Sequence, residues 1–301
     1  MDKRKLGNVK QIISAYQMEI KDGSGYGKKM VLVNNGELEV MFNADNALDI
    51  AWVKYCGQNV SFLSKNGFNS NAGAFKQQFE GGFLYTCGID NVSGCEKEKL
   101  IHGSLHHKKA DNVSVKTDDQ KVIVSGTIVN SYLVGDNVVM QRNYVVYSDR
   151  IEIHDTLENQ GFLDAEYVIL YHVNFGYPLL DEGTSLTFDA TNTIAANPKT
   201  QNTLHLAKVI TAPLDVDTED LYYHTLTEGK VTLENDKIGI KCQMQYDVNA
   251  FPYLVEWRNL ISGDYVLGIE PSTTRFDQYK KNVLKPQATD KFDITVCFEK
   301  I

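Results

Sequence analysis

The chain has 301 residues, of which 43% are hydrophobic and 23% are charged, and its formal net charge at pH 7 is −9. This composition is typical of a folded globular protein and excludes wholesale disorder. The negative charge argues against nucleic acid and anionic membranes as partners, and no stretch of about 18 apolar residues predicts a transmembrane helix.

The N-terminus and the cysteines indicate which cellular compartment to expect for the protein. Residues 1–5 are mostly charged and no apolar segment follows them, so we expect no secretory signal. The five cysteines are dispersed, odd in number and without a C-x-x-C pair, which is typical of reduced thiols in a cytoplasmic protein rather than of disulfides or a zinc site. They are Cys56, Cys87, Cys95, Cys242 and Cys297.

Few segments have helical periodicity. We predict a helix over residues 9–18, with Asn8 as its N-cap, and weaker ones over 217–226 and 274–284. Alternating or β-branched and aromatic segments are much more frequent and predict strands. The clearest are 121–129, 138–147, 151–157, 165–173 and 292–298, with a hairpin turn at Ser148-Asp149.

Turn signals recur about every ten residues, so the chain is expected to hold on the order of twenty short strands. There is no alternation of strands and helices, no internal repeat and no linker rich in proline or serine. We therefore predict an all-β fold, a large antiparallel β-sandwich with a few short helices, formed by a single domain over residues 1–301. By analogy of fold, the concave face of such a sandwich suits an extended polar ligand such as a sugar.

Two strand ends carry candidate catalytic side chains. His172 lies on the same side of its strand as Val168 and Leu170, with Asn174 next along. Glu270 shares one side of another strand with Gly268, where the missing side chain leaves room for a ligand. The competing interpretations are a core histidine bonded to a backbone carbonyl and a carboxylate that protects a strand edge.

Further candidates are weaker. Trp257 beside Arg258 suits the face and the hydroxyls of a sugar, although tryptophan in an all-β protein is more often core. His102 precedes Gly103 in an H-x-x-x-H-H segment that reaches His107. That spacing would hold a metal only on a helix, so we expect no metal and interpret the segment as an exposed polar loop.

Five segments, taken together and in this order, resemble the galactose-mutarotase-like superfamily of aldose 1-epimerases, and more closely a bacterial branch of unassigned function. They are DNALDI (45–50), GGFLYTCGIDN (81–91), LIHG (100–103), YHVNFGYP (171–178) and YVLGIEP (265–271). The resemblance extends over roughly residues 6–300. It implies a β-supersandwich with a sugar in its concave face.

The resemblance also implies roles for residues. His172 matches the acid that protonates the ring oxygen, Glu270 matches the base that takes the proton of the anomeric hydroxyl, and His102 matches a histidine that holds the sugar. Asn174, Trp257 and Arg258 are further candidates for sugar contact. Asn46 and Ser104 stand where this branch often carries arginine, and both positions are expected near the sugar.

The expected activity is interconversion of the α and β anomers of a free sugar by ring opening, which needs no cofactor because both steps are proton transfers. The expected partner is a small-molecule sugar, and a homodimer is compatible with the sequence. Three alternatives remain. They are a non-catalytic sugar-binding module, a phosphosugar epimerase whose basic run 106–109 meets the phosphate, and a lyase or hydrolase pairing Glu270 with Asp181 or Asp247.

Overall fold

The computed structural model describes residues 2–69, 74–93, 100–216 and 219–301. Strands dominate, and the helices of the described residues are single turns. The α-helical turns are α1 (Phe75–Gln78) and α2 (Pro198–Gln201), and the 3-10 turns are η1 (Lys3–Lys5), η2 (Val9–Gln11), η3 (Leu105–His107) and η4 (Leu204–Leu206). The predicted all-β class is confirmed. Within the described segments, no helix has both the length and the apolar character needed to cross a membrane.

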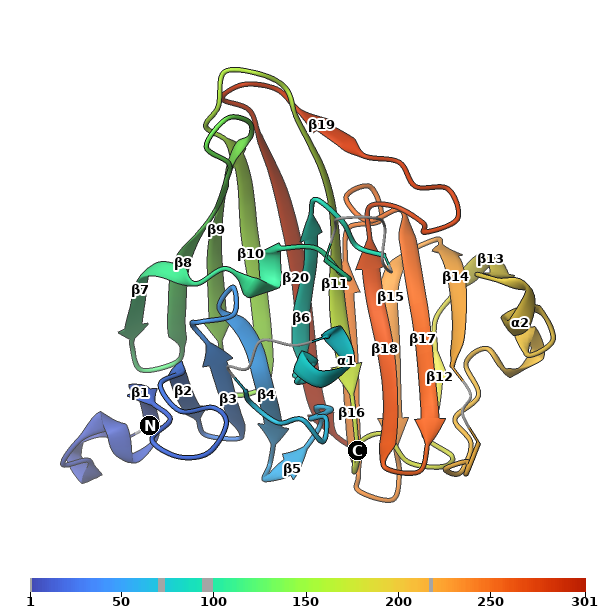
Figure 1. Cartoon of the computed structure of the whole chain (residues 1–301). Coiled ribbons are helices and arrows are strands. Elements are labelled where there is room, and N and C mark those ends of the chain that lie inside the picture. Colours follow the sequence, from blue (N-terminus) through green and yellow to red (C-terminus); the bar gives the residue numbers. More distant parts are fainter. Residues whose placement is uncertain (1, 70–73, 94–99, 217–218) are drawn as a thin grey trace.

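The strands form three antiparallel sheets (Figure 1). The five-stranded sheet runs in chain order: β1 (Ile13–Glu19), β2 (Lys29–Asn35), β3 (Leu38–Asn43), β4 (Asp49–Tyr55) and β5 (Gln58–Asn59). The eight-stranded sheet has the order β12 (Ser185–Thr187), β15 (Gly229–Asn235), β16 (Ile240–Tyr246), β20 (Thr289–Lys300), β10 (Arg150–Asn159), β9 (Asn137–Val146), β8 (Val122–Ser131) and β7 (Ala110–Thr117).

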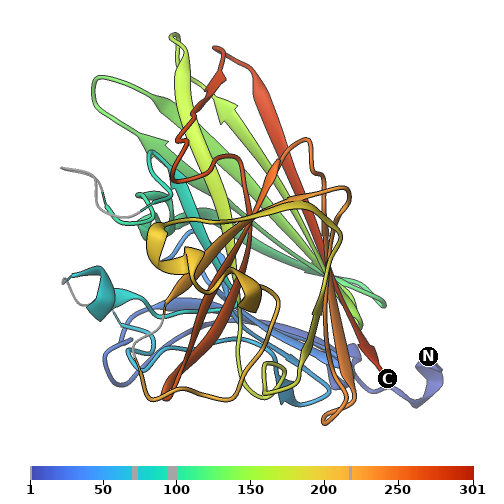
Figure 2. The same cartoon turned by 90° about the vertical axis from the view of Figure 1, so that its right-hand side faces the viewer.

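The remaining sheet carries the site, and we call it the site sheet. Its order is β13 (Ala190–Ala195), β14 (Asp220–Leu226), β17 (Tyr253–Ile261), β18 (Asp264–Ser272), β11 (Ala165–Phe175) and β19 (Asn282–Leu284), with β6 (Leu84–Ile89) also paired to β11. Figures 1 and 2 show α1 standing off the face of this sheet near β6 and β18, while α2 lies by its β13–β14 edge.

The predicted strands are confirmed with small shifts of their ends. The segments 121–129, 138–147, 151–157, 165–173 and 292–298 correspond to β8, β9, β10, β11 and β20. β9 and β10 pair antiparallel, so the turn expected at Ser148-Asp149 is present. Many of their buried residues are β-branched, as a half-buried pleated surface favours.

The three helix predictions are wrong. Asn8 does cap a helix, because its side chain accepts from the backbone N–H of Lys10 at 2.9 Å, but the helix is the single turn η2 and β1 follows it. Residues 219–226 belong to an extended segment that contains β14, and positions 217–218 lie outside the described residues. Residues 274–284 form a turn followed by β19. In β1 and β14, ladder bonds to a neighbouring strand outweigh a weak local helical preference.

The two faces of the site sheet pack differently. On β11, Ile169, Tyr171 and Val173 point into the main hydrophobic core, which draws on all three sheets. Val168 and Leu170 point the other way, into a smaller cluster with Tyr85 and Val255. The smaller cluster covers only part of this second face. A pocket can therefore form beside it.

Candidate active site

His172 and Glu270 come together through strand register. β11 and β18 pair antiparallel with Leu170 opposite Ser272 and Val173 opposite Ile269, and the same register places His172 opposite Glu270. Side chains that are directly opposite in an antiparallel pair lie close together on one face. The two residues that the resemblance assigned to acid and base therefore meet on the second face of the site sheet.

The two side chains touch and are almost completely buried. His172 Nε2 lies 3.1 Å from Glu270 Oε1, and the residues are 3% and 2% exposed. Neither His172 Nδ1 nor Glu270 Oε1 has a hydrogen-bond partner of suitable geometry. Buried polar atoms are nearly always satisfied, so an unsatisfied atom on each of two touching side chains calls for an explanation, and a ligand supplies one.

Burial sets the protonation of this pair. Loss of solvent raises the pKa of Glu270 well above its ordinary value, and the negative charge of Glu219 adds to the effect. Loss of solvent lowers the pKa of His172 well below its ordinary value, and His102 contributes in the same direction. Both shifts favour the uncharged forms. In these uncharged forms the carboxyl group can donate a proton and the imidazole can accept one.

Gly268 makes room for the pair. A Cβ atom at this position would lie 2.5 Å from Glu270 Oε1 and 3.1 Å from His172 Cε1. Any side chain here would push the carboxyl group away from the imidazole. The sequence suggested open space beside Glu270, and the structure shows that His172 and Glu270 share it.

The pair lies in the wall of a pocket of about 320 Å³ that also contains His102, Trp257 and Glu219. Trp257 meets the His172 ring edge-on, with 5.2 Å between ring centroids, and its Nε1–H donates to Glu219 Oε1 at 2.8 Å. Phe79 stands perpendicular to Trp257 at 6.3 Å. The wall thus combines aromatic faces with a few polar atoms, the usual composition of a small-molecule site.

His102 is held by a strained loop. Its backbone lies in the left-handed region with φ of 62°, and a Cβ at the following Gly103 would come within 2.2 Å of the Asn91 carbonyl oxygen. His102 Nδ1 lies 3.1 Å from the carbonyl oxygen of Val92, which can only accept, so Nδ1 carries the proton and Nε2 is an acceptor. Burial lowers the pKa of His102 to about 4 and keeps the ring neutral.

Arg258 does not lie with Trp257. Successive strand residues point to opposite faces, so Arg258 is on the core side of β17, where its Nη1 donates to the Leu206 carbonyl at 2.6 Å. Arg258 was expected to contact the sugar, but its side chain does not line the pocket. Adjacency in sequence suggested that the two side chains cooperate, and strand geometry separates them.

Three other expected positions lie outside this pocket. Asn174 is buried, and its Nδ2 donates to the carbonyls of Gly82 and His172. Asn46 belongs to a neighbouring polar cluster, where it contacts Lys28 and donates to the His106 carbonyl at 3.2 Å. Ser104 donates to Asp90 at 2.9 Å. None of these side chains lines the pocket of the His172–Glu270 pair.

The segment 102–107 is not an exposed loop. Residues 105–107 form the turn η3, and His106 is 3% exposed. His106 Nδ1 lies 2.7 Å from Asp49 Oδ2, and Asp49 in turn meets the buried guanidinium of Arg142 at 2.6 Å. The interpretation as a solvated loop is wrong because these long-range ionic partners draw the turn inward.

The two aspartates that the lyase or hydrolase alternative pairs with Glu270 lie elsewhere. Asp181 pairs with Lys237 at 2.8 Å, Asp247 accepts from the backbone N–H of Asn249 at 2.8 Å, and neither lines the pocket. The second carboxylate there is Glu219, which no sequence motif indicated. Phe75, Phe79 and Phe276 were missed as well, because they reach the pocket from segments outside the ladder that carries the pair.

Comparison with solved structures defines the fold class as galactose mutarotase-like. An aldose 1-epimerase candidate from Klebsiella pneumoniae aligns with a TM-score of 0.85 at 18% identity, over 96% of this chain and 88% of its own. A galactose mutarotase-like protein from Clostridium acetobutylicum aligns at 0.73 and 15%, over 97% and 100%. A mutarotase candidate from Salmonella typhimurium aligns at 0.71 and 14%, over 97% and 95%.

Within that fold class, residues 25–290 match the family model described as a domain of unknown function, DUF4432. The chain belongs to this family. No curated protein matches the sequence. At these identities the solved structures share the fold alone.

Proposed function

We propose that this protein is an aldose 1-epimerase-like isomerase that interconverts the α and β anomers of a free sugar. The observation that carries the proposal is the His172–Glu270 contact of 3.1 Å in the wall of a pocket, with polar atoms that lack partners. Such a pair offers one proton donor and one acceptor at a single point. Anomer exchange requires these two groups and no cofactor.

The geometry suits the reaction because both reacting oxygens are bonded to C1 of the sugar. One member of the pair removes the proton of the anomeric hydroxyl while the other donates a proton to the ring oxygen. The bond between C1 and the ring oxygen breaks and the C1 carbonyl forms. After rotation about the C1–C2 bond, the same transfers run in reverse and close the ring on the opposite face.

The resemblance assigns the base to Glu270 and the acid to His172. Burial favours the uncharged forms of both groups, in which Glu270 can donate a proton and His172 can accept one, so one direction of the relay uses His172 Nε2 as the acceptor. The opposite order uses the same two atoms in the reverse step. In either direction one member of the pair gives up a proton while the other takes one.

The test is the rate of anomer exchange, followed by NMR or polarimetry across a panel of aldoses. We expect His172→Asn and Glu270→Gln each to lower the enzyme-catalysed rate about 10²- to 10⁴-fold, the usual contribution of a positioned acid or base. Equal rates for wild type and both variants would remove the catalytic assignment. Circular dichroism of each variant controls for loss of folding.

Non-catalytic sugar binding is the second candidate function. It is favoured by the absence of arginine at positions 46 and 104 and by the placement of Asn46 outside the pocket of the pair. It predicts that wild type binds sugar by calorimetry but does not accelerate anomer exchange. Under this alternative Glu270→Gln would retain binding.

We also propose that the protein works in a reducing compartment such as the cytoplasm. Cys56, Cys87, Cys242 and Cys297 are all free thiols, and Cys95 lies outside the described residues. Burial raises the pKa of Cys87 and Cys242 well above the ordinary value of a thiol, so both are kept in the unreactive form. Thiol titration under native and denaturing conditions tests this proposal.

A further inference from the structure

A second pocket adjoins the one described above, and we call it the polar pocket. Its volume is about 320 Å³. Phe75 and Phe79 line both pockets, so the two hollows share one aromatic wall. The polar pocket also contains Lys28 and Glu80, which no sequence motif indicated, and His106 from the basic run 106–109.

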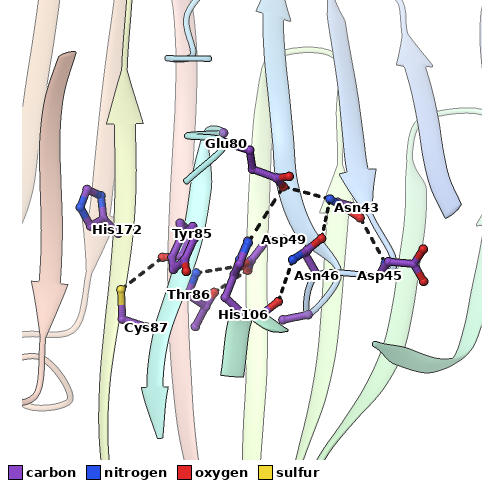
Figure 3. A network of polar contacts seen from close by, with 12 residues as sticks. Asn43, Asp45, Asn46, Asp49, Glu80, Tyr85, Thr86, Cys87, His106 and His172 are labelled. Atoms are coloured by element: carbon purple, nitrogen blue, oxygen red, sulfur yellow. Dashed lines mark hydrogen bonds and ion pairs between the residues drawn. The ribbon is translucent and has the colours of Figure 1, made fainter. Parts of the chain in front are cut away.

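Buried interactions hold the side chains of the polar pocket in place. Lys28 Nζ lies 3.6 Å from Glu80 Oε2, and these side chains are 7% and 6% exposed. Asn43 donates to Glu80 Oε1 at 2.9 Å. Figure 3 shows Glu80, Asn43, Asn46, His106 and Asp49 linked in one network, with Tyr85 and then His172 to one side of it. The donors and acceptors are therefore oriented before any ligand arrives, which lowers the entropic cost of binding.

One hydroxyl group in this wall has no partner. Tyr85 is 1% exposed and its hydroxyl oxygen is unsatisfied. Its ring stacks on His106 with 3.6 Å between centroids. Burial raises the pKa of Tyr85 well above its ordinary value, so the phenol keeps its proton and can donate. Tyr85 is also the cross-strand partner of His172, so the strand in the wall of the polar pocket is the direct neighbour of the strand that carries His172, about 4.8 Å away.

The charges of the polar pocket are balanced. Lys28 faces Glu80, and Lys109 lies 3.3 Å from Asp45. The pKa of His107 is lowered to about 4, chiefly by burial, so that ring is neutral at pH 7. Balanced charge with many fixed donors and acceptors suits a neutral, hydroxyl-rich ligand better than a phosphate.

We propose that the polar pocket binds the second sugar unit of a neutral reducing disaccharide, while the reducing-end ring occupies the pocket of His172 and Glu270. This inference rests on the proposed function, because it extends the substrate of the same site. The shared wall of Phe75 and Phe79 provides an apolar surface at the junction of the two rings. The polar side chains beyond it meet the hydroxyls of the second ring.

The test compares kcat/KM for anomer exchange of glucose and galactose with that of maltose, cellobiose, lactose and melibiose. We expect at least one disaccharide to exceed its reducing-end monosaccharide about tenfold. Tyr85→Phe should reduce this ratio about fivefold, the worth of one net hydrogen bond. The matched control is Tyr144→Phe, because Tyr144 also has a buried hydroxyl without a partner but lies in the main core. The control should leave the ratio unchanged.

The outcomes separate the two proposals. Exchange of monosaccharides with no disaccharide preference, or a ratio that Tyr85→Phe does not change, overturns the disaccharide subsite and leaves the proposed function intact. A preference for glucose 6-phosphate over glucose also overturns it. If no sugar is exchanged, the proposed function fails, and calorimetry with the same disaccharides decides the subsite. Binding weakened about fivefold by Tyr85→Phe alone supports it, and absence of disaccharide binding overturns it.

Discussion

The site sheet carries two buried histidine–glutamate pairs, one on each face. His172 and Glu270 face the pocket with 3.1 Å between Nε2 and Oε1, while His224 and Glu256 face the core with 3.0 Å between Nε2 and Oε2. Residue types, separation and burial are nearly the same. Contact distance and burial alone would therefore rank the two pairs equally.

The pairs differ in their remaining partners. Both oxygens of Glu256 accept from the backbone N–H of Lys208, at 2.9 and 3.2 Å, and His224 Nδ1 lies 2.9 Å from Thr193 Oγ1. The pocket pair lacks such partners at His172 Nδ1 and at Glu270 Oε1. A fully bonded buried pair holds a fold together, whereas an unsatisfied pair keeps its hydrogen-bonding capacity for a ligand.

The largest effect on stability is expected at the core pair. His224→Leu leaves the Glu256 carboxylate buried without its imidazole, which should cost about 3 kcal/mol of unfolding free energy. Anomer exchange of the folded fraction should remain. Urea unfolding and the exchange assay measure both quantities on one preparation. A variant with wild-type stability would contradict the structural role of this pair.

Gly268→Ala should act on the pocket pair with less effect on folding. The new Cβ would meet Glu270 Oε1 at 2.5 Å, and the flexible carboxyl group can move aside. We expect exchange to fall about tenfold or more, because acid–base catalysis depends on position, with a loss of stability of about 1 kcal/mol. Gly7→Ala is the control, since its nearest neighbour would be Gln11 Oε1 at 3.8 Å. Full exchange in Gly268→Ala would show that the contact geometry is not required.

Glu270→Gln should change how the free energy of unfolding depends on pH. The folded pKa of Glu270 is raised, so the folded protein retains a proton that the unfolded chain releases above about pH 4.3, and wild type loses stability as pH rises from there toward the folded pKa. The glutamine variant lacks this loss. Its advantage in unfolding free energy over wild type should therefore grow between pH 5 and pH 8. Urea titrations at several pH values measure the difference, and a constant difference would contradict the raised pKa.

Part of the difference between the two pairs could be predicted from the sequence. Strand alternation placed Glu270 with Gly268 and placed His172 at the end of an apolar strand, and the structure joins these positions. The same alternation could have excluded Arg258 from the ligand face, since it adjoins Trp257 in one strand. In contrast, the contact of His106 with Asp49 and the reach of α1 over the pocket depend on closure between distant segments. Local periodicity contains no information about such contacts.

The smallest expected effect concerns Glu219, which is exposed but lies at the pocket. Its negative charge contributes to the raised pKa of Glu270, and its Oε1 accepts from Trp257. Glu219→Gln retains an acceptor for Trp257 and removes the charge. Ionisation of Glu270 then becomes easier, so Glu270 loses its proton at lower pH. The alkaline limb of the profile of exchange rate against pH therefore moves to lower pH. Solvent screening limits the shift to less than about one pH unit.

The charge-retaining variant Glu219→Asp separates this effect from a change in packing. If charge is the cause, the aspartate variant keeps the alkaline limb near the wild-type position, even where its shorter side chain no longer reaches Trp257 and KM rises. If both variants move the limb equally, the contact with Trp257 governs the profile instead. The comparison between the two faces predicts no corresponding effect at Glu256, because the carboxyl group there is closed off by Lys208 and His224.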